Sequence, residues 1–148
     1  MQIRELDQPD LQELLALYAD QHEVDDPVPT LAIAESVWKE LLSSPHFRYF
    51  GVILDGQLVA SCNLTVIPNL TRACRPYGLI ENVVTHRAYR NRGLGKALLA
   101  RAVKIAWEHN CYKVMLMTGR KDEATLRFYT SAGFDPEGKQ AFIAKPSA

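Results

Sequence analysis

The stretch YRNRGLGKALL, residues 89–99, carries glycines at positions 93 and 95 and an arginine on either side of Asn91. Small and apolar residues follow at once, which is typical of a helix beginning there. A helix N-terminus presents unpaired backbone N–H groups and the positive end of the helix dipole, so it binds phosphate groups well. Glycine also lets the backbone approach a ligand closely. The stretch therefore predicts an anion-binding turn at the start of a helix.

The charge distribution supports this prediction. The formal net charge is zero, but no acid lies between Glu81 and Glu108. The same interval holds six bases: Arg87, Arg90, Arg92, Lys96, Arg101 and Lys104. Such an interval favours a polyanionic ligand at the turn, whereas general nucleic-acid binding would call for a net basic domain. We therefore expect no nucleic-acid partner.

Length and composition bound the remaining possibilities. A chain of 148 residues with 47% apolar content suits one domain, residues 1–148, with a full core. No apolar run approaches the ~20 residues that span a bilayer, so no membrane association is expected. The N-terminus lacks a basic-then-apolar signal pattern, which favours a cytoplasmic protein. Three widely spaced cysteines match neither a disulfide framework nor a metal site, and no metal is expected.

Periodicity predicts a mixed α/β sheet in one domain. The clearest hairpin covers residues 48–67 and turns at Asp55-Gly56, a pair that tolerates the positive φ of a tight turn. Helices are expected after Asp7, from Thr30 to about residue 42 with Ile33, Val37 and Leu41 as its apolar stripe, over 93–108, and from Asp122 to Gly133. Further strands are expected at residues 3–6, 79–85, 112–118 and 140–145.

Two common phosphate-binding motifs do not fit the glycine turn. A Walker loop needs Ser or Thr after Gly95-Lys96, where Ala97 stands, and a glycine five positions before Gly95. A dinucleotide fingerprint needs a third glycine, where Leu98 stands. The pattern that fits is R-x-x-G-x-G, formed by Arg90, Gly93 and Gly95.

That pattern follows ENVVTHRAY and precedes RFYTSAGF by about 30 residues. The combination resembles the Gcn5-related N-acetyltransferase (GNAT) superfamily, and most of all its glucosamine-6-phosphate and aminoalkylphosphonate N-acetyltransferase branches. The resemblance implies a mostly antiparallel sheet with splayed central parallel strands and about four helices. It also implies an acetyl-CoA-dependent N-acetyltransferase, and it allows a homodimer, because many members pair through sheet edges or their last strands.

The resemblance assigns the cofactor contacts. Backbone groups of Val83, Val84 and Thr85 would bind the pantetheine arm, as an added strand does at a sheet edge. A bulge near 82–84 would splay the neighbouring strands. The pyrophosphate would be held by Arg90, Asn91, Arg92, Gly93, Leu94, Gly95 and Lys96, with Leu94 turned inward. Asp122 stands where the family often has a cofactor-contacting Asn, and it serves equally well as a helix cap.

The same resemblance suggests catalytic roles. Tyr129, in LRFYTSAGF, matches the family tyrosine that protonates the leaving thiolate, and an unperturbed tyrosine is protonated at pH 7. Glu81 is a candidate base that would act through water, although an ion-pairing role is equally compatible. Asn82 would point to the opposite side of the strand from Glu81 and bind the acceptor. A backbone N–H near Val83 or Val84 would stabilise the oxyanion.

The acceptor is less defined. The first 40 residues carry ten acids against two bases, and Glu23, Asp25 and Asp26 lie in or near the loop between the first two helices, which wall the acceptor site in this superfamily. Asp25 and Asp26 therefore favour a cationic small-molecule amine. A phosphorylated amino sugar or aminophosphonate remains open, because Arg72, Arg75, Arg120 and Lys121 lie in loops. Acetylation of a protein, or an acetyl-CoA-binding sensor without turnover, is a further alternative.

Overall fold

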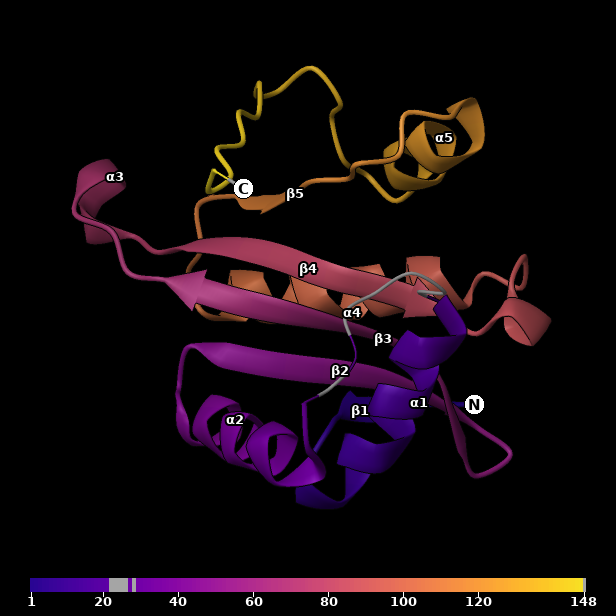
Figure 1. Ribbon diagram of the computed structural model, residues 1–148. Helices are drawn as coiled ribbons and strands as arrows, with labels where there is room; N and C mark the ends of the chain where they lie inside the picture. The colour runs from indigo at the N-terminus through magenta and orange to yellow at the C-terminus, as the bar shows by residue number, and fades with distance from the viewer. Residues whose placement is uncertain (22–26, 28, 148) are drawn as a thin grey trace.

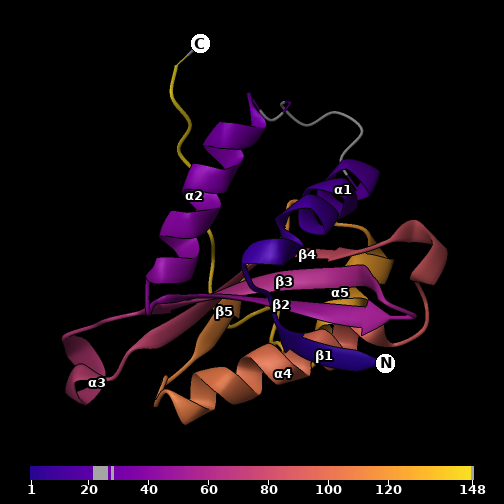
Figure 2. The ribbon, with the colours of Figure 1, turned by 90° about the horizontal axis from the view of Figure 1, so that it is seen from below.

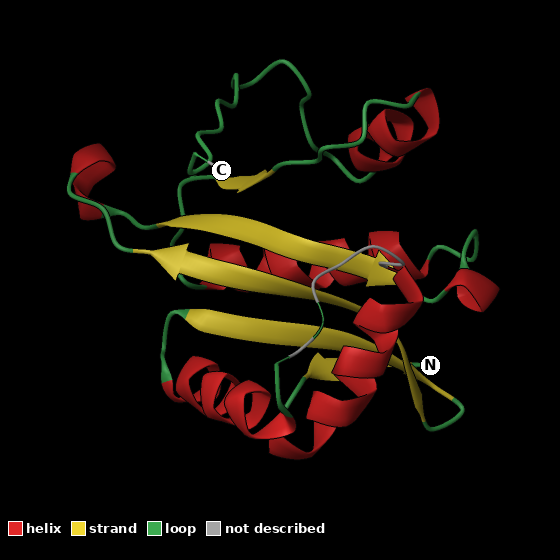
Figure 3. Cartoon of the chain, in the orientation of Figure 1, coloured by secondary structure: helices red, strands yellow, loops and turns green. Residues whose placement is uncertain are grey.

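The computed structural model describes residues 1–21, 27 and 29–147. Figures 1 and 3 show one sheet covered by helices. The elements in chain order are β1 (Gln2–Glu5), the 3-10 turn η1 (Gln8–Asp10), α1 (Leu11–Gln21), α2 (Leu31–Ser43), β2 (Phe47–Leu54), β3 (Gln57–Ile67), the single turn α3 (Thr71–Cys74), β4 (Tyr77–Thr85), the 3-10 turn η2 (Arg87–Tyr89), α4 (Leu94–Glu108), β5 (Val114–Leu116) and α5 (Glu123–Ser131).

The described strands form one sheet in the order β1-β2-β3-β4-β5. The first three pairs are antiparallel, and β4 pairs with β5 in parallel. The β2–β3 hairpin turns at Asp55 (φ 51°) and Gly56 (φ 77°), as the sequence predicts. The mostly antiparallel sheet with one parallel pair confirms the expected fold class, and the parallel pair lies at one edge of the described sheet.

Local capping explains where the helices begin. The Thr30 side chain accepts a hydrogen bond from the backbone N–H of Ile33, which starts α2 at the predicted position. Asp7 and Asp10 form a capping box ahead of α1. Gly133 adopts φ 97° just after α5, the left-handed conformation that commonly ends a helix.

Two cores hold the layers together, one on each face of the sheet. Figure 2 shows α1 and α2 on one side and α4 on the other. The α4 side packs Leu98, Leu99 and Ala102 against Phe50 and Ile80. The other side joins α1 and α2 to the sheet through Leu6, Leu11, Leu14, Leu17, Trp38, Leu58 and Val84. The two faces of the sheet are therefore covered by different helices.

Two sequence expectations fail in this architecture. Ile33 and Val37 are about half exposed, and the residue of α2 that is buried is Trp38, because the helix packs with a face rotated from the expected stripe. The expected strand at 140–145 forms no ladder, and Phe142 and Ile143 are exposed. A segment with β-forming residues becomes a strand only where an edge pairs with it, and the described part of β5 pairs over three residues of β4.

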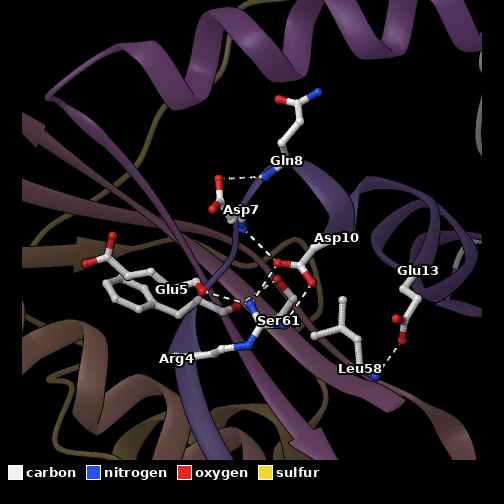
Figure 4. A network of polar contacts seen from close by, with 9 residues as sticks. Arg4, Glu5, Asp7, Gln8, Asp10, Glu13, Leu58 and Ser61 are labelled. Atoms are coloured by element: carbon white, nitrogen blue, oxygen red, sulfur yellow. Dashed lines mark hydrogen bonds and ion pairs between the residues drawn. The ribbon is translucent and has the colours of Figure 1, made fainter. Parts of the chain in front are cut away.

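Acidic side chains of the N-terminal region form a structural network (Figure 4). Arg4 donates two hydrogen bonds of 2.8 Å to the carboxylate of Asp10, whose oxygen also accepts the backbone N–H of Asp7 at 2.7 Å. The Glu13 carboxylate accepts the backbone N–H of Leu58 at 2.9 Å, which ties α1 to β3. The carboxylates of Asp10 and Glu13 therefore hold the N-terminal elements together.

Within the described residues, no helix is both long and apolar enough to cross a membrane. The cysteines are free, with Cys62 and Cys111 buried and Cys74 exposed, which agrees with thiols that take no part in a disulfide framework.

Candidate active site

The glycine turn before α4 has the backbone geometry that anion binding would require. Gly93 is the N-cap of α4 with φ 75°, and no side chain caps the helix there. Asn91 is also left-handed, with φ 60°. The first N–H groups of α4 are therefore available to an anion. In the described part of the chain, no carboxylate forms an ion pair with Arg90, Arg92 or Lys96. This arrangement fits a pyrophosphate group.

The two arginines of the turn also have structural contacts. Arg90 donates from Nε to the Thr85 carbonyl at 3.2 Å and from its terminal nitrogen to the Gln21 side chain at 2.7 Å. Arg92 lies over the Tyr89 ring, 5.1 Å from its centroid. These contacts join the turn to the end of β4 and to α1, so the turn is held in place before any ligand binds.

The two glycines have different physical roles. Gly93 needs its left-handed backbone and has open space around it. Gly95 lies within α4, where an added Cβ would stand 3.0 Å from Cζ of Phe128 and 3.6 Å from Oγ1 of Thr85. Leu94 is buried, as the sequence predicts. Gly95 therefore allows α5 to pack closely on the start of α4.

The strand before the turn is bulged and splayed, as the resemblance implies. Opposite β3, two residues of β4 occupy the space of one between the pairs Asn63↔Glu81 and Ser61↔Val84, and Asn82 has φ 52°. Strand β5 pairs with β4 only over residues 78–80. In the described structure, the β5-facing edge of β4 is therefore unpaired from Glu81 onwards, where Val83, Val84 and Thr85 lie.

The bulge also changes the direction of Asn82. Its side-chain amide donates to the Oδ1 of Asn63 at 3.0 Å. Asn63 is the cross-strand partner of Glu81, and directly paired residues share a face of the sheet. The expectation that Asn82 points away from Glu81 is therefore wrong, because strict alternation fails at a bulge. Asn63 is a buried polar residue that the sequence analysis missed.

Tyr129 packs against the core on the α4 side of the sheet and lies within electrostatic range of Glu81. It is half-buried on α5, and its ring lies 4.9 Å from that of Phe128. Burial raises the pKa of the Tyr129 phenol, and the nearby Cys62 and Glu81 raise it further, against the opposing effect of Arg120. The phenol is therefore protonated at neutral pH. The catalytic roles of Tyr129 and Glu81 stay predictions.

Comparison with known proteins now decides the family. The model of the acetyltransferase (GNAT) family matches residues 11–134. The chain belongs to the GNAT family.

Individual relatives agree with this GNAT assignment. The glucosamine 6-phosphate N-acetyltransferase of Trypanosoma brucei brucei is 40% identical over 85 residues, which cover 57% of this chain and 56% of that protein. The chain thus spans about half the length of the curated relatives it matches. A solved structure from Agrobacterium tumefaciens str. C58 is 41% identical with a TM-score of 0.92, over 99% of this chain and 100% of that one. An acetyltransferase structure from Trypanosoma brucei is 29% identical with a TM-score of 0.80, over 97% and 99% of the two chains.

Asp122 of this GNAT chain has the capping role. Its carboxylate accepts the backbone N–H of Thr125 at 3.1 Å and pairs with Arg120 at 3.2 Å. The hydrogen bonds from the Thr125 hydroxyl and backbone lower the pKa of Asp122. The N-cap of α5 is therefore the role of Asp122 that the structure shows, and a contact between Asp122 and the cofactor stays a prediction.

The acids that suggested a cationic acceptor include some that the structure describes and some that it does not. Asp25 and Asp26 lie outside the described residues, as does Glu23. Among the described acids of the GNAT chain's first helices, Asp20 pairs with Arg87 at 3.0 Å, and the contacts of Asp10 and Glu13 are those of Figure 4. No group of three or more His, Cys, Asp or Glu side chains in the described part could hold a metal ion.

Proposed function

We propose that this GNAT chain transfers the acetyl group of acetyl-CoA to the primary amine of a small molecule. The observation that carries the proposal is the bulged, unpaired edge of β4, which ends beside the uncapped N-terminus of α4. Such an edge can pair with an extended amide-containing arm, while the helix terminus takes its pyrophosphate. Tyr129 and Glu81 stand at the point where that arm would end.

Glu81 and Tyr129 each carry out one proton transfer in the proposed reaction. Acetyl-CoA supplies the thioester carbonyl. For an amine of pKa about 10.4, only about one molecule in 2,500 is the free base at pH 7, which is equivalent to roughly 4.6 kcal/mol. Glu81 accepts the amine proton through a water molecule as the C–N bond forms. A backbone N–H of Val83 or Val84 donates to the oxyanion. Tyr129 gives its proton to the sulfur as the C–S bond breaks.

A phosphorylated amino sugar is the acceptor we favour. The Trypanosoma brucei brucei relative is a glucosamine 6-phosphate N-acetyltransferase. At least three of the ten acids in the first 40 residues have structural partners, because Arg4 binds Asp10, Arg87 binds Asp20 and the backbone of Leu58 binds Glu13. A cationic amine, selected by Asp25 and Asp26, is the competing acceptor. An acetyl-CoA sensor without turnover would need neither Glu81 nor a Tyr129 that is protonated at neutral pH.

Thiol release from acetyl-CoA tests the proposal. Glucosamine 6-phosphate and spermidine are offered separately, with the wild type and with Tyr129→Phe. We expect thiol release with the amino sugar phosphate, together with N-acetylated product. We expect a loss of about 10²-fold or more in Tyr129→Phe, since about 10²-fold is the lower end of the range for one proton-transfer residue. A chain that binds acetyl-CoA but releases no thiol with any amine would support the sensor instead. Faster release with spermidine would support the cationic acceptor.

Thermal unfolding with acetyl-CoA separates binding from turnover. At a ligand concentration of 100 times Kd the gain is about 2.7 kcal/mol, which should raise Tm by several degrees. Gly93→Glu should abolish that rise, because its bulk and charge would occupy the anion site. A rise with ATP or NAD but none with acetyl-CoA would show that the turn binds another ligand.

A further inference from the structure

Two cations and two tyrosines meet at the end of β4 that lies away from the glycine turn. Lys113 Nζ lies 5.3 Å from the ring centroid of Tyr77 and 5.2 Å from that of Tyr112. Arg72 Cζ lies 5.7 Å from the centroid of Tyr112, and the two rings are 6.2 Å apart in an edge-on arrangement. We call Arg72, Tyr77, Tyr112 and Lys113 the tyrosine–cation cluster. Figure 1 shows α3, which carries Arg72, at this end of the sheet.

The cluster has an uncompensated positive charge. Neither Arg72 nor Lys113 forms an ion pair with a carboxylate among residues 1–21, 27 and 29–147. Arg75 adds a third charge nearby, but it is occupied, since it donates to the carbonyls of Asn110 and Cys111 at 3.3 Å. Two like charges that share one aromatic ring repel each other unless an anion joins them.

The backbone that carries Arg72 is strained. Arg72, Ala73 and Cys74 have φ values of 55°, 58° and 57° in succession. The left-handed conformation costs roughly 1–2 kcal/mol per residue outside glycine. Strain of this kind is concentrated at functional sites, where it holds a side chain in a required position. Here the strained turn places the guanidinium of Arg72 beside Tyr112.

Tyr77 of the tyrosine–cation cluster lies on the same face of the sheet as Glu81. A Cβ added to Gly78 would stand 3.2 Å from Cγ2 of Val114 in β5 and 3.6 Å from Cβ of Ala106 in α4, so position 78 faces α4. Tyr77, its neighbour, therefore faces the opposite side, and alternation along β4 gives that side Leu79 and Glu81 as well, ahead of the bulge. Four residues at about 3.3 Å each place Tyr77 and Glu81 roughly 13 Å apart. Half-buried Leu79 lies between them and pairs with Met115 of β5.

We propose that the tyrosine–cation cluster binds the phosphate monoester of the acceptor, while Glu81 receives its amine. This inference rests on the proposed function and specifies its acceptor site. Arginine and lysine donate charge-assisted hydrogen bonds to phosphate, and an anion between them relieves their mutual repulsion. The apolar side chain of Leu79 suits the ring of a sugar lying flat between the two ends. The long side chains of Lys113 and Glu81 bridge the rest of the separation.

Paired acceptors test the cluster. We compare kcat/KM for glucosamine 6-phosphate and glucosamine in the wild type, Lys113→Gln and Arg72→Gln, with Lys104→Gln on the exposed surface of α4 as the matched control. Each cluster variant should lose about 10- to 100-fold with the phosphorylated sugar, the loss expected for one charge-assisted hydrogen bond. The value with glucosamine should stay within about twofold, as should both values in Lys104→Gln. Equal losses with both sugars, or none in either cluster variant, would overturn the proposal.

A binding measurement keeps this test separate from turnover. Glucose 6-phosphate carries the phosphate but no amine, so its calorimetric Kd does not depend on acetyl transfer. We expect it to bind the wild type and the Lys104 control, and to bind Lys113→Gln about tenfold or more weakly. Inorganic phosphate at the same concentration should bind less tightly than the sugar phosphate. Equal binding of glucose 6-phosphate by wild type and Lys113→Gln would refute the cluster, even if acetyl transfer occurs.

Discussion

Gly95→Ala tests the packing between α4 and α5, the helix that carries Tyr129, the proposed proton donor. The new Cβ would stand 3.0 Å from Cζ and 3.4 Å from Cε2 of Phe128, closer than two carbons pack at equilibrium. Phe128 must therefore move, and Tyr129 follows it on the same helix. Overpacking of this size costs about 1–3 kcal/mol. Alanine regains up to about 1 kcal/mol of helix propensity, so we expect a net loss of about 1 kcal/mol.

The sign of the effect should depend on Phe128. In a Phe128→Ala background the ring is gone, the clash disappears, and Gly95→Ala should stabilise the protein by up to about 1 kcal/mol. Urea unfolding of the four proteins in this cycle gives the coupling energy directly. Gly93→Ala is the control, because position 93 has open space but φ 75°, so its loss should be the same with or without Phe128.

Activity should follow the same coupling. Displacement of a catalytic group by a fraction of an ångström to 1 Å can cost up to about 10²-fold in rate. We expect Gly95→Ala to lower kcat with little change in the Kd of acetyl-CoA. If Gly95→Ala destabilises the protein equally in both backgrounds, the glycine does not act through Phe128, and its role lies in the anion site alone.

Three further outcomes follow from the structure. Ala73→Gly should stabilise the protein by about 0.5–1 kcal/mol, because glycine removes the left-handed strain at φ 58° but loses more entropy on folding, and Tm should rise by about 2 °C. The hydrogen bonds from Arg4 lower the pKa of Asp10; stability from this pair is therefore present above the unfolded pKa of about 3.9 and lost as pH falls below it, and Asp10→Asn should flatten urea-unfolding stability over that range. Because the pKa of Tyr129 is raised, the alkaline limb of kcat should lie above pH 10 and vanish in Tyr129→Phe, while an unchanged limb would assign it elsewhere.

Local signals predicted most of the fold. The Asp55-Gly56 turn set the β2–β3 hairpin, and Thr30 marked the start of α2, because both act through neighbouring residues. The buried face of α2 could not be found this way, since Ile33 and Trp38 both fit a helical stripe and the choice between them depends on the rest of the core. The expected strand at 140–145 failed for a related reason, because strand formation needs a partner edge that sequence does not specify.

In the candidate site, too, features set by neighbouring residues could be predicted and features that depend on distant residues could not. The backbone geometry of the glycine turn could be predicted because it depends on a few consecutive residues, and anion binding there stays a prediction. The tyrosine–cation cluster could not be predicted, because Arg72 and Lys113 are far apart in sequence and meet only through the parallel pairing of β4 with β5. Lys113 is therefore absent from the residues that the sequence suggested for the acceptor.

Asn63 contacts the β4 bulge from a neighbouring strand, and no sequence motif marks this contact. Its Oδ1 accepts the amide of Asn82, and that bond holds the left-handed residue that starts the bulge. Without the bulge, β4 would alternate regularly, and the N–H groups of Val83 and Val84 would turn towards different neighbours. Asn63 lies on another strand and carries no motif, yet it fixes the edge on which the proposed cofactor arm and oxyanion depend. The residues proposed for the chemistry therefore lie on β4, but a residue of β3, Asn63, contacts the bulge that sets their geometry.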